Sequence, residues 1–495
     1  MATSTQRVSP LLQSFWFWAG IITLARIIVL VTADGDLGPD EAQYWVWAQN
    51  PDFGYFSKPP MIAWIIGLTT SLFGDAQWAI RVSAPFIHLG TASFLYVTTR
   101  SLFDKKIALF TGLGWLTLPG IAVSSLLITT DAPLLFFWSG ALFFMFRILQ
   151  KNHTSLTDFI ALGAMIGLGL MSKYAMIYFP VALAALLILS PTSRKKFQTR
   201  YSLATIVLAV AIIAPNLLWN AAHDFQTVSH TAANANWGAT LFKPARLGGF
   251  LIAQFAVFGP ILFASLIAAF VVKTGPLRRA INHQWLALAI FSATPLLIVS
   301  GQAFISRAHA NWAAASYPAA LILATAFLCT INQKRLVKAS LTLHAVIAMI
   351  IAICVTNFAL LDKLGAGRAV SELRGWRMMT DQIAEAATAR DYDSILFDDR
   401  SMIGEMLYYQ RDKDFEVAAL DPNAGVDHFY EASIPFDPVR HQRALFVSIL
   451  PSDAHVDYRF ERIEKVGVVT GALGPQSPRE FTLFDISGYY EPGTR

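Results

Sequence analysis

The sequence predicts a polytopic α-helical membrane protein with an α/β domain at its C-terminus. Of its residues, 55% are hydrophobic and only 14% are charged, whereas soluble domains carry about 25% charged residues. The mean hydropathy is +0.48. The acidic residues are unevenly divided, with ten of the 33 in residues 1–361 and 23 in residues 362–495. We therefore expect a transmembrane domain over 1–361 and a soluble domain over 362–495.

Apolar runs long enough to cross about 30 Å of hydrocarbon recur through the transmembrane domain. They predict about eleven spans, at residues 12–33, 79–102, 107–127, 132–149, 157–175, 176–191, 201–221, 249–272, 284–301, 311–330 and 339–361. The run at 59–73 is shorter and begins with two prolines, so we expect a helix lying at the membrane interface. The first run ends in Val-Thr-Ala, which resembles a signal-peptidase site. Because its apolar region exceeds the roughly 7–15 residues of a signal peptide, we expect an uncleaved helix.

Basic residues predict the orientation, because cytoplasmic loops retain most lysines and arginines. With the N-terminus in the cytoplasm, the cytoplasmic loops contain Lys105, Lys106, Arg147, Lys151, Arg194, Lys195, Lys196, Arg200, Lys273, Arg278, Arg279, Lys334, Arg335 and Lys338. The opposite side contains only Lys58, Lys173, Lys243, Arg246 and Arg307. The first outer loop, 34–78, and the C-terminal domain then lie on the outer side. This sorting accounts for the net charge of +5, so no nucleic-acid partner is expected.

Helical and strand patterns alternate in the C-terminal segment. We expect helices at 376–390 and 401–410 and strands at 393–399, 444–450 and 481–489, which together predict an α/β domain. The two cysteines, Cys329 and Cys354, lie in apolar runs of the transmembrane domain, which excludes a disulfide framework. Gly163 and Gly167 form a G-x-x-x-G pattern that favours close packing of two helices.

Carboxylates gather after the first apolar run. Five of the ten acids of the transmembrane domain lie within residues 34–52, and Asp40 and Glu41 precede the helical stretch Ala-Gln-Tyr-Trp-Val-Trp-Ala-Gln. One interpretation is helix capping, because carboxylates stabilise helix N-termini. The other is that a carboxylate at the membrane boundary acts as a general base on an incoming hydroxyl group. Asp131, which begins the run Asp-Ala-Pro-Leu-Leu-Phe-Phe, has the same two interpretations.

Cations occur near the same boundary. Lys58 and Arg307 are suited to bind a phosphate group, although a snorkelling lysine and an interface-anchoring arginine are the alternatives. Lys173, near the outer end of a span, has the same two interpretations. His309 and Asn311 add polar groups at the start of another span, where a lone histidine is more often structural.

Sequence motifs exclude several enzyme classes. The chain has no P-loop, G-x-G-x-x-G, H-E-x-x-H or G-x-S-x-G pattern. Asp34-Gly-Asp36 and Asp391-Tyr-Asp393 match an acid-x-acid pattern, but three residues are a weak signal. The carboxylates and His309 are able to bind a divalent metal ion, yet no ligand spacing requires one. No cofactor is firmly implied, and the metal site stays unknown.

Several motifs between residues 34 and 140 identify a family. In order they are the Asp40-Glu41 pair, an aromatic helix, Gly-Tyr-Phe-Ser-Lys-Pro-Pro, the short apolar run, and Thr-Thr-Asp-Ala-Pro. In this order the chain resembles the GT-C glycosyltransferases of the dolichyl-phosphate-mannose-protein mannosyltransferase type, over roughly residues 10–360. It is most similar to the bacterial branch, which includes the lipid A aminoarabinose transferase and the rhizobial lipopolysaccharide galacturonosyltransferases.

The resemblance implies a polyprenyl-phosphate sugar as the donor. It implies Asp40 as the catalytic acid of the first loop with Glu41 as its neighbour, Asp131 as the second acid, and Lys58 as the contact of the donor phosphate. Arg307 matches no motif of the family, and its assignment depends on topology alone. The other candidate site residues are Lys173 for the donor phosphate and Tyr55, His309 and Asn311 for the substrates.

A polyprenyl-phosphate sugar donor explains why acidic residues and a lysine occur in the same loop. A phosphate leaving group departs as an anion and needs cations more than a proton, whereas the acceptor hydroxyl needs a base. The aromatic residues of the loop suit the lipid headgroup layer, and stacking on sugar rings is the alternative. They are Tyr44, Trp45, Trp47, Tyr55 and Phe56.

The sequence thus predicts a membrane glycosyltransferase of the bacterial inner (plasma) membrane, with its C-terminal domain in the periplasm. Its acceptor would be a cell-envelope glycolipid such as lipopolysaccharide, a polysaccharide or a protein. A lipid or sugar transporter or flippase is the main alternative, but it predicts ionisable residues deep within spans. In this sequence nearly all of them sit at span ends, and no span interior shows a clear acidic residue. A non-enzymatic scaffold with a sensor domain is a third. The enzyme hypothesis requires Asp40, Lys58 and Asp131 to converge on one cavity.

Overall fold

The computed structural model describes residues 14–150, 155–234, 242–271, 283–392, 394–421, 425–454, 456, 459–474 and 478–490. The chain forms two compact units. The first, here the membrane unit, comprises residues 1–31, 58–65 and 81–352, and the second, here the mixed unit, comprises residues 32–57, 66–80 and 353–495. The mixed unit therefore joins the C-terminal segment to two stretches of the loop 34–78, which the sequence analysis assigned to the transmembrane domain.

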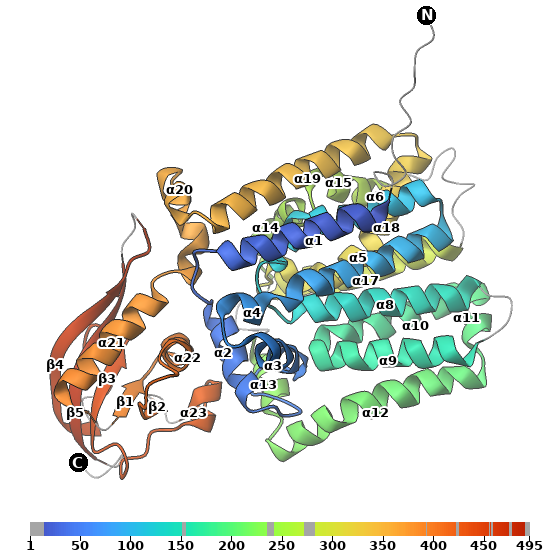
Figure 1. Ribbon diagram of the computed structural model, residues 1–495. Helices are drawn as coiled ribbons and strands as arrows, with labels where there is room; N and C mark the ends of the chain where they lie inside the picture. Colours follow the sequence, from blue (N-terminus) through green and yellow to red (C-terminus); the bar gives the residue numbers. More distant parts are fainter. Residues whose placement is uncertain are drawn as a thin grey trace, which may run out of the picture. The chain divides into compact units, whose positions relative to one another are not determined.

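The membrane unit is helical, and many of its long helices lie side by side along one direction (Figure 1). Its helices are α1 (Phe15–Thr32), α5 (Ser83–Leu102), α6 (Lys105–Thr117), α7 (Pro119–Ser124), α8 (Asp131–Gln150), α9 (Leu156–Ser172), η2 (Tyr174–Ile177), α10 (Tyr178–Leu189), α11 (Pro191–Phe197), α12 (Arg200–Ala222), α13 (Gln226–Asn234), α14 (Pro244–Val257), α15 (Pro260–Val271), α17 (His283–Ile305), η3 (Ala310–Ser316), α18 (Tyr317–Thr330) and α19 (Lys334–Val355). Helices α3 (Met61–Phe73) and α4 (Gln77–Arg81) are divided between the two units.

Six helical segments within the described residues are long and apolar enough to cross a membrane, or up to eight if each of two bent pairs is one span. The six are α1, α8, α12, α17, η3 with α18, and α19. Large apolar side chains such as Trp16, Leu24 and Ile28 of α1 are exposed, as expected for helices that contact lipid. The protein is thus a multi-pass membrane protein, and the count of eleven spans stays a prediction. Lys151, Lys273, Arg278 and Arg279 of the predicted cytoplasmic loops lie outside the described residues.

The predicted span at 249–272 is not one straight helix. Helices α14 and α15 meet at a bend of 117°. Gly259 has a φ of +90° at the bend, and Pro260 follows as the first residue of α15. Proline removes a backbone donor and disfavours helical geometry at the residue before it. Pro119 divides the predicted span at 107–127 into α6 and α7 in the same way.

The G-x-x-x-G pattern packs two helices closely, as predicted. A Cβ atom on Gly163 would lie 2.6 Å from the carbonyl oxygen of Thr205, and one on Gly167 would lie 2.7 Å from Ile212. Thr205 also donates a hydrogen bond of 2.7 Å to the carbonyl of Phe159. Glycine therefore lets α9 and α12 approach at backbone distance.

The mixed unit contains a five-stranded sheet in the order β2-β1-β3-β5-β4 (Figure 1). Strand β1 (Ser394–Phe397) pairs in parallel with β2 (Val417–Ala419) and β3 (Arg443–Ser448), and β5 (Arg479–Tyr489) pairs antiparallel with β3 and β4 (Phe460–Gly471). Helices α21 (Trp376–Arg390) and α22 (Arg400–Tyr409) pack against each other and against this sheet. The unit also contains α2 (Pro39–Gln49), α20 (Phe358–Lys363), η4 (Gly367–Leu373) and α23 (Phe429–Ser433).

The predicted α/β character of the C-terminal segment is confirmed. Both predicted helices are present, and the three predicted strands correspond to β1, β3 and β5. Strands β2 and β4 were missed. β2 has only three residues, and β4 is a mostly solvated edge strand that is rich in charge, so neither carries a strong apolar alternation.

Candidate functional site

Helix α2 carries the acidic pair of the first loop. It begins with Pro39 after the N-cap Gly38 and ends before Asn50, in agreement with proline's preference for the first helical position. The Glu41 carboxylate is buried and accepts the Gly38 N–H at 3.0 Å. This contact supports the capping interpretation for Glu41.

Asp40 lies one residue earlier but faces a different partner. Its side chain is 61% exposed, and Oδ1 accepts a hydrogen bond of 3.1 Å from Nη2 of Arg400, the first residue of α22. Nη1 of the same guanidinium donates to Oε1 of Gln43 at 2.9 Å. Among the described residues Asp40 has no hydrogen bond to the amides of its own helix, so its carboxylate is presented outward and held by an arginine.

The start of α2 is anchored to the C-terminal segment. Oδ2 of Asp36 accepts the backbone N–H of Trp376 at 2.9 Å, at the N-terminus of α21. The Tyr409 hydroxyl lies 3.3 Å from Oδ1 of Asp36 and accepts the Leu37 N–H at 2.9 Å. Burial raises the pKa of Asp36, although these hydrogen bonds oppose the rise, and burial beside Asp36 raises the pKa of Tyr409. The network fixes the backbone that leads into Asp40.

Tyr55 is structural in this arrangement. Its ring stacks on Trp47 at a centroid distance of 4.7 Å. Its hydroxyl lies 3.0 Å from the carbonyl oxygen of Trp47 and accepts the Asp52 N–H at 3.0 Å. Burial raises the pKa of this hydroxyl to about 12. A buried phenol that already has these partners is a poor substrate ligand, so the predicted substrate role of Tyr55 loses support.

The second acid lies in the membrane unit and joins three elements. Asp131 is the first residue of α8, and its Oδ1 forms an ion pair of 2.7 Å with Nζ of Lys173, which follows α9. Its Oδ2 accepts a hydrogen bond of 2.9 Å from Nδ2 of Asn311 in η3. The side chains of Asp131 and Lys173 are 12% and 23% exposed. The structure thus brings together three of the predicted site residues.

The buried side chains of Tyr317 and Gln254 form a hydrogen-bonded pair that supports η3. The Tyr317 hydroxyl donates to Oε1 of Gln254 at 2.6 Å, and Nε2 of Gln254 donates to the carbonyl of Ala310 at 3.2 Å. Gln254 is fully buried in α14. Because buried polar groups are costly unless they are paired, this contact fixes the turn that presents Asn311.

The remaining candidates occupy loops of the membrane unit. Lys58 is half-buried and stands three residues before α3. Arg307 and His309 are exposed on the loop between α17 and η3, where the His309 ring lies 5.4 Å from the Trp312 ring. Arg246, on α14, donates a hydrogen bond of 3.3 Å to the Ser306 carbonyl beside Arg307. Arg246 therefore contacts the backbone of this loop next to Arg307.

Metal ligands do not cluster in the described part of the chain. Within those residues, no three His, Cys, Asp or Glu side chains lie close enough to hold a metal ion. The acid-x-acid pattern at 391–393 includes residue 393, which lies outside them.

Arg400, Gln43 and Gln254 contact or support the candidate residues, and the sequence analysis missed them. Arg400 is 360 positions from Asp40, and no local pattern connects them. Gln254 could have been identified from the sequence, because a glutamine inside an apolar run needs a buried hydrogen-bond partner.

Comparison with known proteins agrees with this architecture. A family model described as "Dolichyl-phosphate-mannose-protein mannosyltransferase" matches residues 57–219. The lipid A galacturonosyltransferase RgtD of Rhizobium johnstonii is 33% identical over 413 residues, which cover 83% of this chain and 85% of RgtD. The lipopolysaccharide core galacturonosyltransferase RgtA of the same organism is 28% identical over 275 residues, 53% of each chain.

Solved structures show the same fold. The apo crystal structure of ArnT from Cupriavidus metallidurans superimposes with a TM-score of 0.65 at 18% identity, over 94% of this chain and 97% of ArnT. The same protein bound to undecaprenyl phosphate gives a TM-score of 0.64 at 17% identity, over 94% and 98%.

Fold and matched motifs together define a membrane-embedded glycosyltransferase of the GT-C class. The chain belongs to the family of bacterial GT-C glycosyltransferases that includes RgtD. The family resemblance inferred from the sequence is confirmed, and the comparisons favour the glycosyltransferase over the transporter alternative.

Proposed function

We propose that this protein transfers a hexuronic acid, most simply galacturonic acid, from a polyprenyl-phosphate donor to a hydroxyl group of a lipopolysaccharide acceptor. The observation that carries this proposal is the 33% identity to a lipid A galacturonosyltransferase over most of both chains. The donor class is supported by the structural likeness to ArnT, which was solved with undecaprenyl phosphate. The reaction takes place at the periplasmic face of the inner membrane, with the N-terminus cytoplasmic and the C-terminal domain periplasmic.

Asp40 is the proposed general base. The acceptor oxygen attacks the anomeric carbon of the donor, the bond from that carbon to the phosphate oxygen breaks, and the acceptor proton passes to the Asp40 carboxylate. Its exposed position on α2 leaves it accessible to a hydroxyl, and the Arg400 guanidinium fixes its orientation. Glu41 contributes by capping the helix that presents Asp40.

The polyprenyl phosphate leaves as an anion and is stabilised by cations. Lys58 and Arg307 are the preferred candidates. Lys173, whose ammonium group forms an ion pair of 2.7 Å with the Asp131 carboxylate, is a further candidate. We propose that the Asp131–Lys173–Asn311 cluster positions the ends of α8, α9 and η3 around the donor, with His309 at its edge.

The test is reconstituted transfer. The purified protein, in a membrane-mimetic, is supplied with polyprenyl-phosphate galacturonate and with purified lipid A or lipopolysaccharide core, and the acceptor is analysed by mass spectrometry. We expect a mass increase of one hexuronic acid on one acceptor class. No transfer with either acceptor, together with transfer from a polyprenyl-phosphate pentose, would reject the hexuronic-acid proposal.

A further inference from the structure

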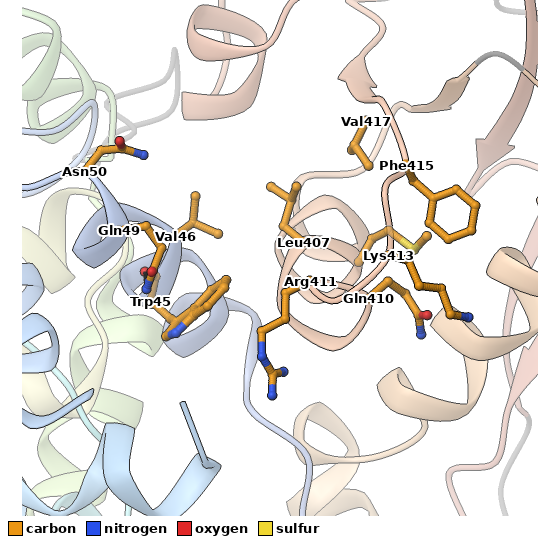
Figure 2. Close-up of a pocket in the computed structure, with 11 residues that line it drawn as sticks. Trp45, Val46, Gln49, Asn50, Leu407, Gln410, Arg411, Lys413, Phe415 and Val417 are labelled. Atoms are coloured by element: carbon orange, nitrogen blue, oxygen red, sulfur yellow. Dashed lines mark hydrogen bonds between the residues drawn. The ribbon is translucent and has the colours of Figure 1, made fainter. Parts of the chain in front are cut away.

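A cavity of about 290 Å³ lies within the mixed unit, between the C-terminal ends of α2 and α22. Figure 2 shows the side chains of α2 on one side and those of α22 and the following loop on the other. The residues that line it are Trp45, Val46, Gln49, Asn50, Met406, Leu407, Gln410, Arg411, Lys413, Phe415 and Val417. The mechanism proposed above uses none of them.

The lining combines three kinds of group. Trp45 and Phe415 supply aromatic faces, and Gln49, Asn50 and Gln410 supply side-chain amides. Nε2 of Gln410 already donates to Oδ1 of Asp381 at 2.7 Å, and Nε2 of Gln49 donates to the Trp45 carbonyl at 3.2 Å. Arg411 and Lys413 supply two exposed cations, and the Lys413 ammonium lies 5.8 Å from the Phe415 ring centroid. Among the described residues, no carboxylate lines the cavity itself, but Asp412, Asp414 and Glu416 alternate with Arg411, Lys413 and Phe415 along the same exposed loop. Aromatic faces and amides suit a sugar ring with its hydroxyl groups, and the two cations suit a carboxylate or phosphate on that sugar.

Two of the lining side chains, Trp45 and Arg411, are held in place before any ligand arrives. Nε1 of Trp45 donates to Oδ1 of Asp75 at 2.7 Å, and the Trp45 ring meets Tyr408 edge-on at 5.1 Å. Nη1 of Arg411 donates to the Tyr408 carbonyl at 2.7 Å, and its guanidinium lies 4.9 Å from the Tyr408 ring centroid. A guanidinium has five N–H donors, so most of those of Arg411 stay available. Such preorganisation lowers the entropy lost on binding.

We propose that this cavity binds an anionic sugar, carboxylated or phosphorylated, of the acceptor glycolipid headgroup. The assignment to the acceptor rests on the proposed function. Helix α2 carries both Asp40 and the cavity residues 45–50. At a rise of 1.5 Å per residue, the cavity lies about 8–15 Å from Asp40 along the helix axis. With 3.6 residues per turn, Trp45 and Gln49 lie roughly 140° and 180° around the helix from Asp40. A saccharide headgroup that is held at the end of α2 and presents a hydroxyl group to Asp40 therefore has to pass around the helix as well as along it.

Equilibrium binding to the full-length protein tests the site without any transfer. The probes are galacturonate, glucosamine 1-phosphate, neutral galactose and inorganic phosphate. We expect both anionic sugars to bind more tightly than galactose and inorganic phosphate. The Arg411→Gln/Lys413→Gln variant should lose about tenfold or more in affinity, and Gln49→Asp, which adds a carboxylate to the lining, should also weaken binding. The matched control is Lys363→Gln/Lys465→Gln, which removes two exposed cations elsewhere in the same unit and should leave binding unchanged.

The transfer assay assigns the site to the acceptor. The Arg411→Gln/Lys413→Gln variant should raise KM for the lipopolysaccharide acceptor about tenfold or more and leave kcat and the KM for the donor near wild type. Anionic sugars that bind no better than galactose, or equal affinities in wild type and variant, would overturn the site. Inorganic phosphate that binds as tightly as glucosamine 1-phosphate would reduce it to a simple anion site and also overturn it. Variant-sensitive binding without transfer by the wild type would reject the proposed function but keep the sugar site.

Discussion

The Asp131→Asn substitution deprives the Lys173 ammonium of a carboxylate that lies 2.7 Å away. Removing one partner of a buried ion pair costs about 3–5 kcal/mol, because the other charge is left uncompensated. The two side chains retain 12% and 23% exposure, so we expect a smaller loss of roughly 2–3 kcal/mol. Lys173→Gln should cost a similar amount, because Asp131 then keeps only the Asn311 amide. The double variant leaves no stranded charge and should recover at least about 1 kcal/mol relative to the sum of the single losses.

The unfolding midpoints of wild type, the two single variants and the double variant in one detergent measure this coupling. Sugar transfer by the same four proteins separates two possible roles of Asp131. Lys173→Gln alone shows first whether transfer needs the lysine. If that variant retains transfer, loss of transfer in both Asp131→Asn and the double variant means that the carboxylate acts on the substrates, whereas recovery in the double variant means that it only neutralises Lys173. Arg147→Gln/Asp158→Asn is the matched control, because it removes another ion pair of the membrane unit, at 2.8 Å, and should leave transfer intact. Strictly additive losses in the Asp131–Lys173 cycle would refute the ion-pair reasoning.

Four further outcomes are expected. Asp40→Asn should lower kcat by about 10²–10⁴ with an unchanged unfolding midpoint, and near-normal turnover would remove Asp40 from the mechanism. Arg400→Lys should retain more transfer than Arg400→Gln at equal stability, because exposed ion pairs contribute only about 0–1 kcal/mol; identical rates in both would leave Arg400 without a positioning role. Lys58→Ala should weaken donor binding roughly ten- to a hundredfold and Lys58→Arg less, whereas equal donor affinities in all three proteins would favour an interface anchor. A reporter that is active only in the periplasm should be active when it is fused after Arg495. Activity of a reporter that works only in the cytoplasm would contradict the predicted topology.

Sequence patterns predicted the helical membrane unit and most of the α/β elements, because apolar length and periodicity are local properties. They did not predict the 117° bend between α14 and α15. Hydropathy alone reads residues 249–272 as continuous, although Gly259 and Pro260 are visible in the sequence and favour a break. Composition averages over a run, whereas a bend depends on two residues within it.

The same difference holds for the candidate site, where local features were predicted from the sequence and long-range contacts were not. The position of Asp131 at a helix start and the capping use of Glu41 follow from local signals, and both alternatives for these residues were open from the sequence. The contact between Asp40 and Arg400 depends on packing between α2 and α22 across 360 positions. The sequence shows an aromatic residue at position 55 but not that its ring stacks on Trp47, and the substrate role of Tyr55 stays a prediction.

The packing of α2 into the mixed unit limits how enzymes of this architecture can be recombined. Gly404 of α22 lies where an added methyl group would come within 3.6 Å of Ala42, and Arg400, Tyr408 and Tyr409 of the same helix are matched to partners in residues 36–77. A chimera that exchanges only the segment after residue 353 would separate these partners. Exchange of the three segments 32–57, 66–80 and 353–495 together keeps each fitted surface with its counterpart. Substitutions on the contacting faces of the C-terminal segment and the first loop are therefore expected to require compensating changes in the other segment.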